Sequence, residues 1–165
     1  MRVGYSDAPE TIVIPSEITH EGVQYRVKPD TEAIFKDCKS LKSVTILDGV
    51  TSIADEAFWG CESLESITIP ASVTSIGYRP FHQCSSLASI VVAEGNTVYD
   101  SRENCNALIH TATNTLLYGC QNTIIPNSVT SIGERAFWDC KSLESITIPN
   151  SVTRIGYQAF YGSIR

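Results

Sequence analysis

Hydrophobic and polar residues alternate in short runs along this chain, and the pattern recurs every 23 residues. In the run SLESITIP, Leu64, Ile67 and Ile69 alternate with Ser66 and Thr68. Alternation over a short β-branched run predicts a half-buried strand with its hydroxyl side chains facing outward. The proline after the run ends the strand, because it has no amide hydrogen to donate to a sheet.

The segment VTSIGxxAFxxC forms the other half of the unit. It contains a short Val/Ile alternation, a glycine turn at positions 77, 133 and 156, and an Ala-Phe-x-x-Cys run. Phe58 and Cys61 are three residues apart, so we expect both on one side of a single helical turn. Each unit therefore predicts a strand, a short β segment and a helical or 3-10 turn.

The chain contains several copies of this unit. Val50–Ser72 and Val129–Ser151 are identical at 17 of 23 positions. Val73–Gly95 is a third copy, Val27–Gly49 is a looser fourth, and Val152–Arg165 begins another that stops in mid-unit. Self-similarity at this period is typical of a leucine-rich solenoid, in which each unit is too small to bury its own apolar face and must stack on its neighbours.

Stacking places equivalent residues above one another. We expect one domain over residues 1–165, with the strands forming a parallel sheet at a spacing of about 4.8 Å. The phenylalanines of the Ala-Phe-x-x-Cys run should form a ladder behind this sheet, at positions 35, 58, 81, 137 and 160.

Two regions depart from the period. Residues 1–30 predict an N-terminal cap: Thr11–Pro15 resembles a strand, Glu21-Gly22 lies between two β-prone runs as in a hairpin turn, and Asp30 replaces a buried isoleucine. Residues 27–95 are repeats. Residues 96–128 span 33 positions instead of 23, and ALIH-TATN-TLLYG within them predicts a β-hairpin projecting from the solenoid. The repeat resumes at 120–126 and continues over 129–165, where the last copy is incomplete.

The motif LxxIxIPxSVTSIGxxAFxxC resembles the BspA-like leucine-rich-repeat family of bacterial cell-surface proteins, a relative of the treponemal repeat type. The resemblance covers roughly residues 12–165. It implies a right-handed solenoid with a concave parallel sheet, secretion or surface attachment, and adhesion to host or bacterial proteins. It implies no catalytic residues.

Composition narrows the classes of partner. The 165 residues carry 18 acidic and 12 basic side chains, for a formal charge of −6. This balance argues against a nucleic-acid or anionic-membrane partner, which calls for a clustered basic face. No run approaches the roughly 18 apolar residues of a membrane span. The segment MRVGYSDAPE lacks the apolar centre of a secretion signal. With the unfinished last repeat, this favours a piece of a longer surface protein over an intracellular one.

The six cysteines fall into two sets. Most occupy one repeat position, at 38, 61, 84 and 140, and their spacing favours buried apolar thiols over the paired C-x₂₋₄-C arrangement of zinc sites. Cys105 and Cys120 flank the predicted hairpin. They lie opposite one another if the hairpin turns between residues 112 and 113, which would permit a disulfide; a left-handed Asn114 would offset them by one residue.

No enzyme chemistry is evident. His20, His82 and His110 lie in three different phases of the repeat, unlike a metal cluster, and no phosphate-binding loop, nucleophile elbow or HExxH motif is present. The slot that holds Asp55-Glu56 in one repeat holds Tyr78-Arg79 and Glu134-Arg135 in others. We interpret this variable slot as solvated surface. We therefore expect no catalytic residues, no cofactor and no metal.

Two columns of residues are candidates for binding. The outward strand positions are Val13, Thr45, Thr68, Val91, Ile124 and Thr147, flanked by Ser43, Ser66, Ser89, Asn122 and Ser145. Hydroxyls there fit ordinary outward β positions, whereas Val91 and Ile124 put adjacent apolar groups at the centre of the face. The residues that follow each phenylalanine are Lys36, Trp59, His82, Trp138 and Tyr161. They should be partly exposed, either as interface anchors or as a shield for the ladder.

The sequence thus predicts a monomeric, non-enzymatic module that binds a protein ligand on its concave sheet. The candidate ligand-binding residues are Ser66, Thr68, Ser89, Val91, Asn122, Ile124, Ser145 and Thr147. The alternative is a passive spacer within a larger surface protein, which the near-identity of two repeats favours. Random polar scatter at the variable positions would support the spacer, and a contiguous apolar or aromatic patch would support binding.

Overall fold

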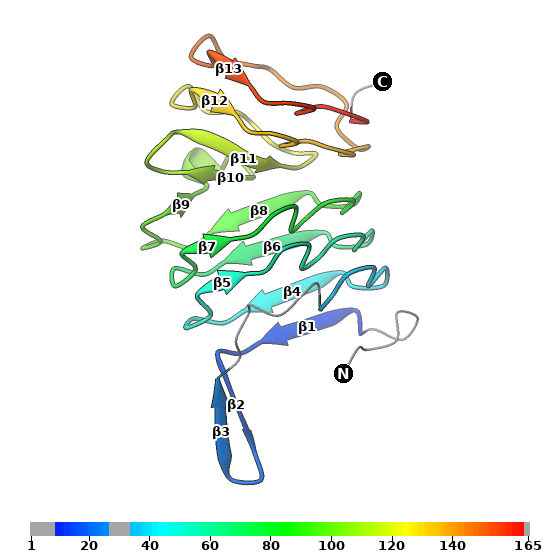
Figure 1. Cartoon of the computed structure of the whole chain (residues 1–165). Helices are drawn as coiled ribbons and strands as arrows, with labels where there is room; N and C mark the ends of the chain where they lie inside the picture. Colours follow the sequence, from blue (N-terminus) through cyan, green and yellow to red (C-terminus); the bar gives the residue numbers. More distant parts are fainter. Residues whose placement is uncertain (1–8, 27–33, 164–165) are drawn as a thin grey trace.

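The chain folds as a stack of coils, each made by one copy of the repeat (Figure 1). A computed structural model describes residues 9–26 and 34–163. Asp30 and the start of the loose repeat at Val27 lie outside these residues. Over residues 43–76, each coil carries a four-residue strand on one side and a two-residue strand on the other, as the two halves of the sequence unit predict.

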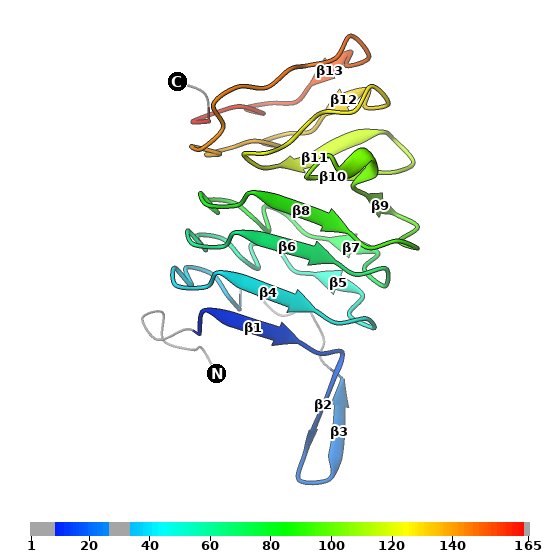
Figure 2. The same ribbon diagram turned by 180° about the vertical axis from the view of Figure 1, so that it is seen from behind.

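The longer strands form a four-stranded parallel sheet (Figure 2). Its order is β1 (Thr11–Ile14), β4 (Ser43–Ile46), β6 (Ser66–Ile69) and β8 (Ser89–Val92). Equivalent residues of successive repeats are direct neighbours, as in the register Ser43, Ser66, Ser89. This confirms the predicted period and the inward side chains, since Leu64, Ile67 and Ile69 are buried. The predicted cap strand is β1, and it joins this sheet.

The short strands lie on the other side of the stack. β5 (Ser52–Ile53) pairs with β7 (Ser75–Ile76), and β12 (Ser131–Ile132) pairs with β13 (Arg154–Ile155), both in parallel. Glycine is required at position 77, directly after β7, for a steric reason: a Cβ there would lie 2.5 Å from the amide nitrogen of Asp55. The Ala-Phe-x-x-Cys run forms hydrogen-bonded turns, and within the described residues the 3-10 assignment is confined to η1 (Arg102–Asn104).

Residues 96–128, which we call the insert, add β9 (Tyr99–Asp100), β10 (Ala107–His110) and β11 (Thr115–Gly119). The predicted antiparallel hairpin is present as β10–β11, but it does not project. Leu108, Ile109 and Leu116 are fully buried, and β11 pairs in parallel with β12 as a member of the stack. The prediction of a projecting hairpin was wrong because three consecutive apolar side chains on β10 require burial on both faces of the strand.

The insert also interrupts the main sheet. Residues 122–125 and 145–148 were predicted as strands of that sheet, but neither segment is a strand. The amide of Ile124 donates to the carbonyl of Cys105 in the insert, at 3.0 Å, so β8 is the last strand of the sheet. Side-chain alternation nevertheless persists, since Thr123 and Ile125 are buried and Ile124 is exposed.

The predicted phenylalanine ladder is present. The ring centroids of Phe35 and Phe58 are 5.5 Å apart, and those of Phe58 and Phe81 are 6.0 Å apart. Phe137 and Phe160 stack at 5.0 Å. Tyr118 of the insert continues the ladder next to Phe81, edge on, at 5.8 Å.

The interior consists of two clusters of buried residues, one on each side of the insert. Leu108 belongs to the first cluster and its neighbour Ile109 to the second, because adjacent residues of β10 point to opposite faces. The hairpin therefore contributes to both clusters.

A different hairpin projects from the stack. β2 (Glu17–His20) and β3 (Val23–Arg26) extend away from the N-terminal end (Figure 1). Their turn is at Glu21 and Gly22, which have φ values of 50° and 78°, and this confirms the predicted turn.

All six cysteines are free thiols. Cys105 and Cys120 form no disulfide, and their thiols donate to the carbonyls of Ala107 and Asn106, at 3.7 Å and 3.1 Å. Asn114 has a φ of 50°, and Ala107 pairs with Gly119, so the second alternative holds and the two cysteines are offset by one residue.

Candidate functional site

The first candidate surface is the outer side of the main sheet with its continuation in residues 122–125 and 145–148, which we call the strand face. Val13, Val91 and Ile124 are 56%, 43% and 72% exposed on it. The neighbouring residues Ser66, Thr68, Asn122, Ser145 and Thr147 are also exposed. Ser89 is half-buried, because its hydroxyl donates to Asn106 of the insert at 3.2 Å.

A cleft of about 540 Å³ opens on this face beyond β8. It is lined by residues from 123–127 and from 145–150, the two segments that fail to form strands. Ile124 and Thr147 line it, as does Ile148, which is 40% exposed although its equivalent Ile69 is fully buried. The structure therefore brings two of the predicted outward residues into one cleft.

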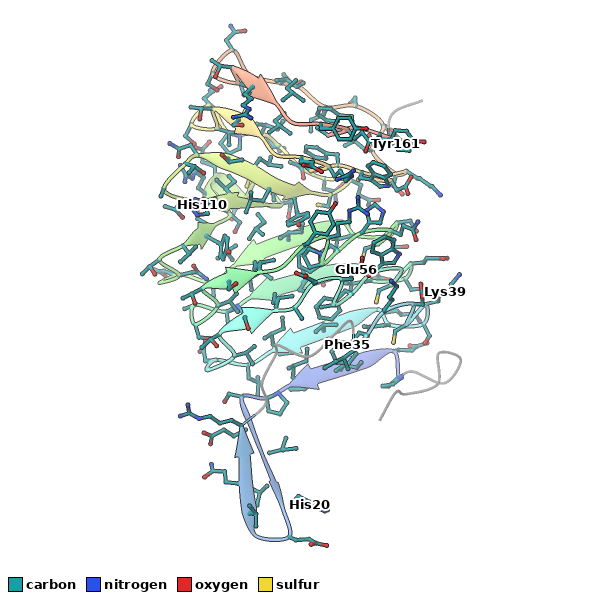
Figure 3. All side chains as sticks on the ribbon, in the orientation of Figure 1. His20, Phe35, Lys39, Glu56, His110 and Tyr161 are labelled. Carbon is teal, nitrogen blue, oxygen red and sulfur yellow. The ribbon has the colours of Figure 1, made fainter. Side chains whose placement is uncertain are left out.

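The second candidate surface is the column of residues that follow the phenylalanines, which we call the aromatic column. Trp59 and His82 have ring centroids 4.4 Å apart, His82 and Trp138 are 5.4 Å apart, and Trp138 and Tyr161 are 4.4 Å apart. The Lys36 ammonium lies 4.6 Å from the Trp59 ring. The column runs along one edge of the stack, the edge that carries Glu56 and Tyr161 in Figure 3.

Exposure along the aromatic column is uneven. Tyr161 is 57% exposed, and Trp59 and Trp138 are half-buried, as predicted. His82 is only 8% exposed, so the expectation of exposure was wrong there. The His82 ring lies between the rings of Trp59 and Trp138, which cover it.

A second cleft, of about 300 Å³, lies beside His82 where the insert enters the stack. We call it the insert cleft. Tyr78, Arg79, Tyr118, Arg135 and Trp138 are among its lining residues. Gly119 also lines it, and a Cβ at this position would overlap the Phe137 ring.

The insert cleft contains residues that were interpreted as solvated surface. Arg79 and Arg135 occupy the same variable slot of two repeats, yet both are half-buried. Each has a left-handed backbone, with φ values of 51° and 55°. The sequence signal that could have identified these two residues is the recurrence of arginine at one repeat position beside the aromatic column.

Electrostatics in the insert cleft follow from burial and from these two cations. The pKa of His82 is lowered, first by burial and then by the neighbouring Arg79, so the imidazole is neutral at pH 7. Arg135 donates to the Tyr78 hydroxyl at 2.9 Å and forms an ion pair with Glu134. Arg79 forms no ion pair with any described residue.

The histidines do not form a site. His20 lies on the projecting hairpin, and His110 lies on the edge opposite Tyr161 (Figure 3). Across residues 9–26 and 34–163, no group of three or more potential metal ligands occurs. In the same part of the chain, none of the helices is long and apolar enough to cross a membrane.

The stacked coils and their repeated strand–turn unit define a leucine-rich-repeat solenoid. The family model described as the BspA type leucine rich repeat region matches residues 27–116 and 113–165, in six copies. The chain belongs to this family. No match was found among the curated proteins.

Solved structures share the fold. The pneumococcal vaccine antigen PcpA is 23% identical, with a TM-score of 0.71 over 94% of this chain and 37% of that one. A leucine-rich repeat protein from Eubacterium ventriosum is 24% identical, with a TM-score of 0.66 over 93% of this chain and 45% of that one. The T. pallidum leucine rich repeat protein is 30% identical, with a TM-score of 0.50 over 92% of this chain and 54% of that one. This chain thus spans about half or less of their lengths.

Proposed function

We propose that this chain is a non-enzymatic protein-binding module of a bacterial surface or secreted protein, with its partner bound across the strand face. The observation that carries the proposal is the set of exposed apolar residues Val13, Val91 and Ile124 on a face otherwise rich in hydroxyls. Exposed apolar groups on one face of a solenoid are suited to serve as contact residues. Family membership supports a protein-interaction or surface module.

The cleft beyond β8 favours an extended segment of a protein partner. Its two walls are segments that form no strand, and the exposed apolar side chains of Ile124 and Ile148 line it. Extended peptides bind by adding to such backbone and by placing alternate side chains in pockets. We further propose a monomer with a right-handed coil and a concave strand face, located outside the cell, in line with the family resemblance.

Binding to immobilised fibronectin, laminin and collagen, measured by surface plasmon resonance, tests this proposal. The double variant Val91→Glu/Ile124→Lys should abolish saturable binding, because it places charges at the centre of the contact. The matched control is Ile18→Lys/Val23→Glu on the projecting hairpin, where both residues are similarly exposed, at 50% and 52%. Equal binding by both double variants would contradict the assignment of the face.

The second candidate is a passive spacer within a longer surface protein. The identity of Val50–Ser72 and Val129–Ser151 at 17 of 23 positions favours it, because a specific binding surface differs from coil to coil. A spacer shows no saturable binding to any of the three proteins. Saturable binding that the strand-face variant removes would exclude it.

A further inference from the structure

The insert cleft concentrates positive charge in an acidic chain. Its lining includes the guanidinium groups of Arg79 and Arg135 and one carboxylate, that of Glu134, which is itself 53% exposed. The nearby Glu56 is already paired with Lys36 at 2.7 Å. Asp139, which also acts on His82, accepts from the Trp138 indole at 3.1 Å. Among the lining residues, two arginines therefore accompany one carboxylate, although the chain as a whole carries a charge of −6.

Both guanidinium groups are incompletely satisfied. The Nε atoms of Arg79 and Arg135 are enclosed and have no hydrogen-bond acceptor. Arg79 also forms no ion pair within the described residues. An enclosed donor without an acceptor destabilises the folded chain, and a charged donor does so more strongly. Among the described residues, Glu134 is the carboxylate that pairs with Arg135, and none pairs with Arg79.

Aromatic rings hold these cations in place. The Cζ atom of Arg79 lies 4.6 Å from the ring centroid of Tyr78, 5.8 Å from Trp59 and 5.9 Å from Trp138. The Cζ atom of Arg135 lies 5.1 Å from Trp138. Cation–π contacts stabilise a guanidinium but accept no N–H in its plane, so the in-plane donors remain suited to a planar anion.

We infer that the insert cleft binds a carboxylate of a protein partner, the side chain of an aspartate or glutamate in an acidic segment, through Arg79 and Arg135. Arginine pairs with carboxylates by parallel N–H···O bonds, and such charge-assisted bonds are the strong ones. The cleft's volume of about 300 Å³ is at the lower end for ligand pockets and suits one side chain with its adjacent backbone. The inference rests on the proposed protein-binding function, at a different surface.

The same contacts argue against a sugar as the occupant. Sugar binding uses the open face of an aromatic ring, and here His82 and Arg79 lie against Trp59. Trp138 is stacked on Tyr161 and also contacts Arg79 and Arg135. Both tryptophan rings are therefore already engaged by neighbouring side chains.

Tryptophan fluorescence provides a direct test, because the chain has two tryptophans and Arg79 lies within 6 Å of both ring centroids. The full chain is titrated with acetylated, amidated hexaglutamate at low ionic strength, and with hexaglutamine as the neutral match. We expect a saturable change with hexaglutamate that high salt weakens, and none with hexaglutamine.

Variants then locate the site. Arg79→Gln and Arg135→Gln should each lower the affinity for hexaglutamate about tenfold or more. The matched control Arg154→Gln, at an exposed arginine of β13, should leave it unchanged. Thermal melting by circular dichroism confirms that each variant is folded, and Arg79→Lys, which keeps the charge, should restore part of the affinity.

Three results would overturn the inference: no saturable response to hexaglutamate, full binding by the double variant Arg79→Gln/Arg135→Gln, or binding of sialyllactose through these arginines without binding of hexaglutamate. The last result would assign the cleft to a carboxylated sugar. The strand-face variant Val91→Glu/Ile124→Lys should bind hexaglutamate normally. Failure of this site is therefore distinguishable from failure of the proposed function.

Discussion

At the scale of single residues, the repeated cysteine links one coil to the next. The thiol of Cys61 donates to the carbonyl of Phe35 at 3.1 Å, and that of Cys84 donates to Phe58 at the same distance. Burial raises the pKa of Cys61 to about 12, so this thiol stays protonated, and a donor, at physiological pH. A small apolar residue with one weak donor suits this position, which explains its recurrence without a metal or a disulfide.

His82 makes stability depend on pH. Burial and then Arg79 lower its pKa, Arg135 lowers it further, and Asp139 and Glu56 act in the opposite sense. The unfolded chain therefore binds a proton more readily at this residue than the folded chain does. Its contribution to stability is fully present above the unfolded pKa, about 6.5, and is lost as the pH falls below that value.

We therefore expect the free energy of unfolding to decrease more between pH 7.5 and pH 5 in the native chain than in His82→Gln. Urea unfolding at the two pH values measures both differences, and the subtraction cancels the contribution of the other titrating groups. Equal decreases in the two proteins would show that His82 is not held neutral by the fold.

At the scale of elements, the repeats were predictable and the insert was only partly so. Periodic residues such as Ile67 face the same neighbours in each coil, so the alternation alone indicates which side is buried. Ile124 shows the limit: its outward orientation was predicted correctly, but its backbone pairing depends on Cys105 in the insert. Arg79 and Arg135 were missed because their burial arises from the insert cleft, which no single repeat encodes.

The phenylalanine ladder allows a quantitative prediction of how much stability is lost when one of its rings is removed. Phe58→Ala should lower the free energy of unfolding by about 3–5 kcal/mol, because the ring is fully buried between Phe35 and Phe81 and leaves a cavity. Phe160→Ala should cost less, because Phe160 is only half-buried and, among the described residues, its ring stacks on Phe137 alone. Urea denaturation measures both; unchanged stability in Phe58→Ala would refute the predicted register.

At the scale of the whole molecule, the insert divides one solenoid into two packed halves. The first cluster contains 20 buried residues and lies behind the four-stranded sheet; the second contains 11, counting described residues only. Stability in a solenoid is the sum of its coils and their interfaces, so a change of packing between coils reduces cooperativity. The hairpin β10–β11 is the part shared by both halves.

The two tryptophans report on the halves separately. Trp59 lies in the first half and Trp138 in the second, so the variants Trp138→Phe and Trp59→Phe each leave one reporter. We expect the half that contains Trp59 to unfold at the higher urea concentration, since it buries more apolar surface. Coincident transitions in fluorescence and circular dichroism would show that the hairpin couples the halves into one cooperative unit.

The division has a mechanical consequence for a protein that is held at one end and pulled at the other. Tension along the stack acts on every interface between coils in series, so the weakest one yields first. We expect the step beyond β8 to be that interface, because the four-stranded sheet stops there, and its opening would lengthen the chain while the coils on either side stay folded. An interruption in the middle of the stack would thus let the protein extend under load before its coils unfold.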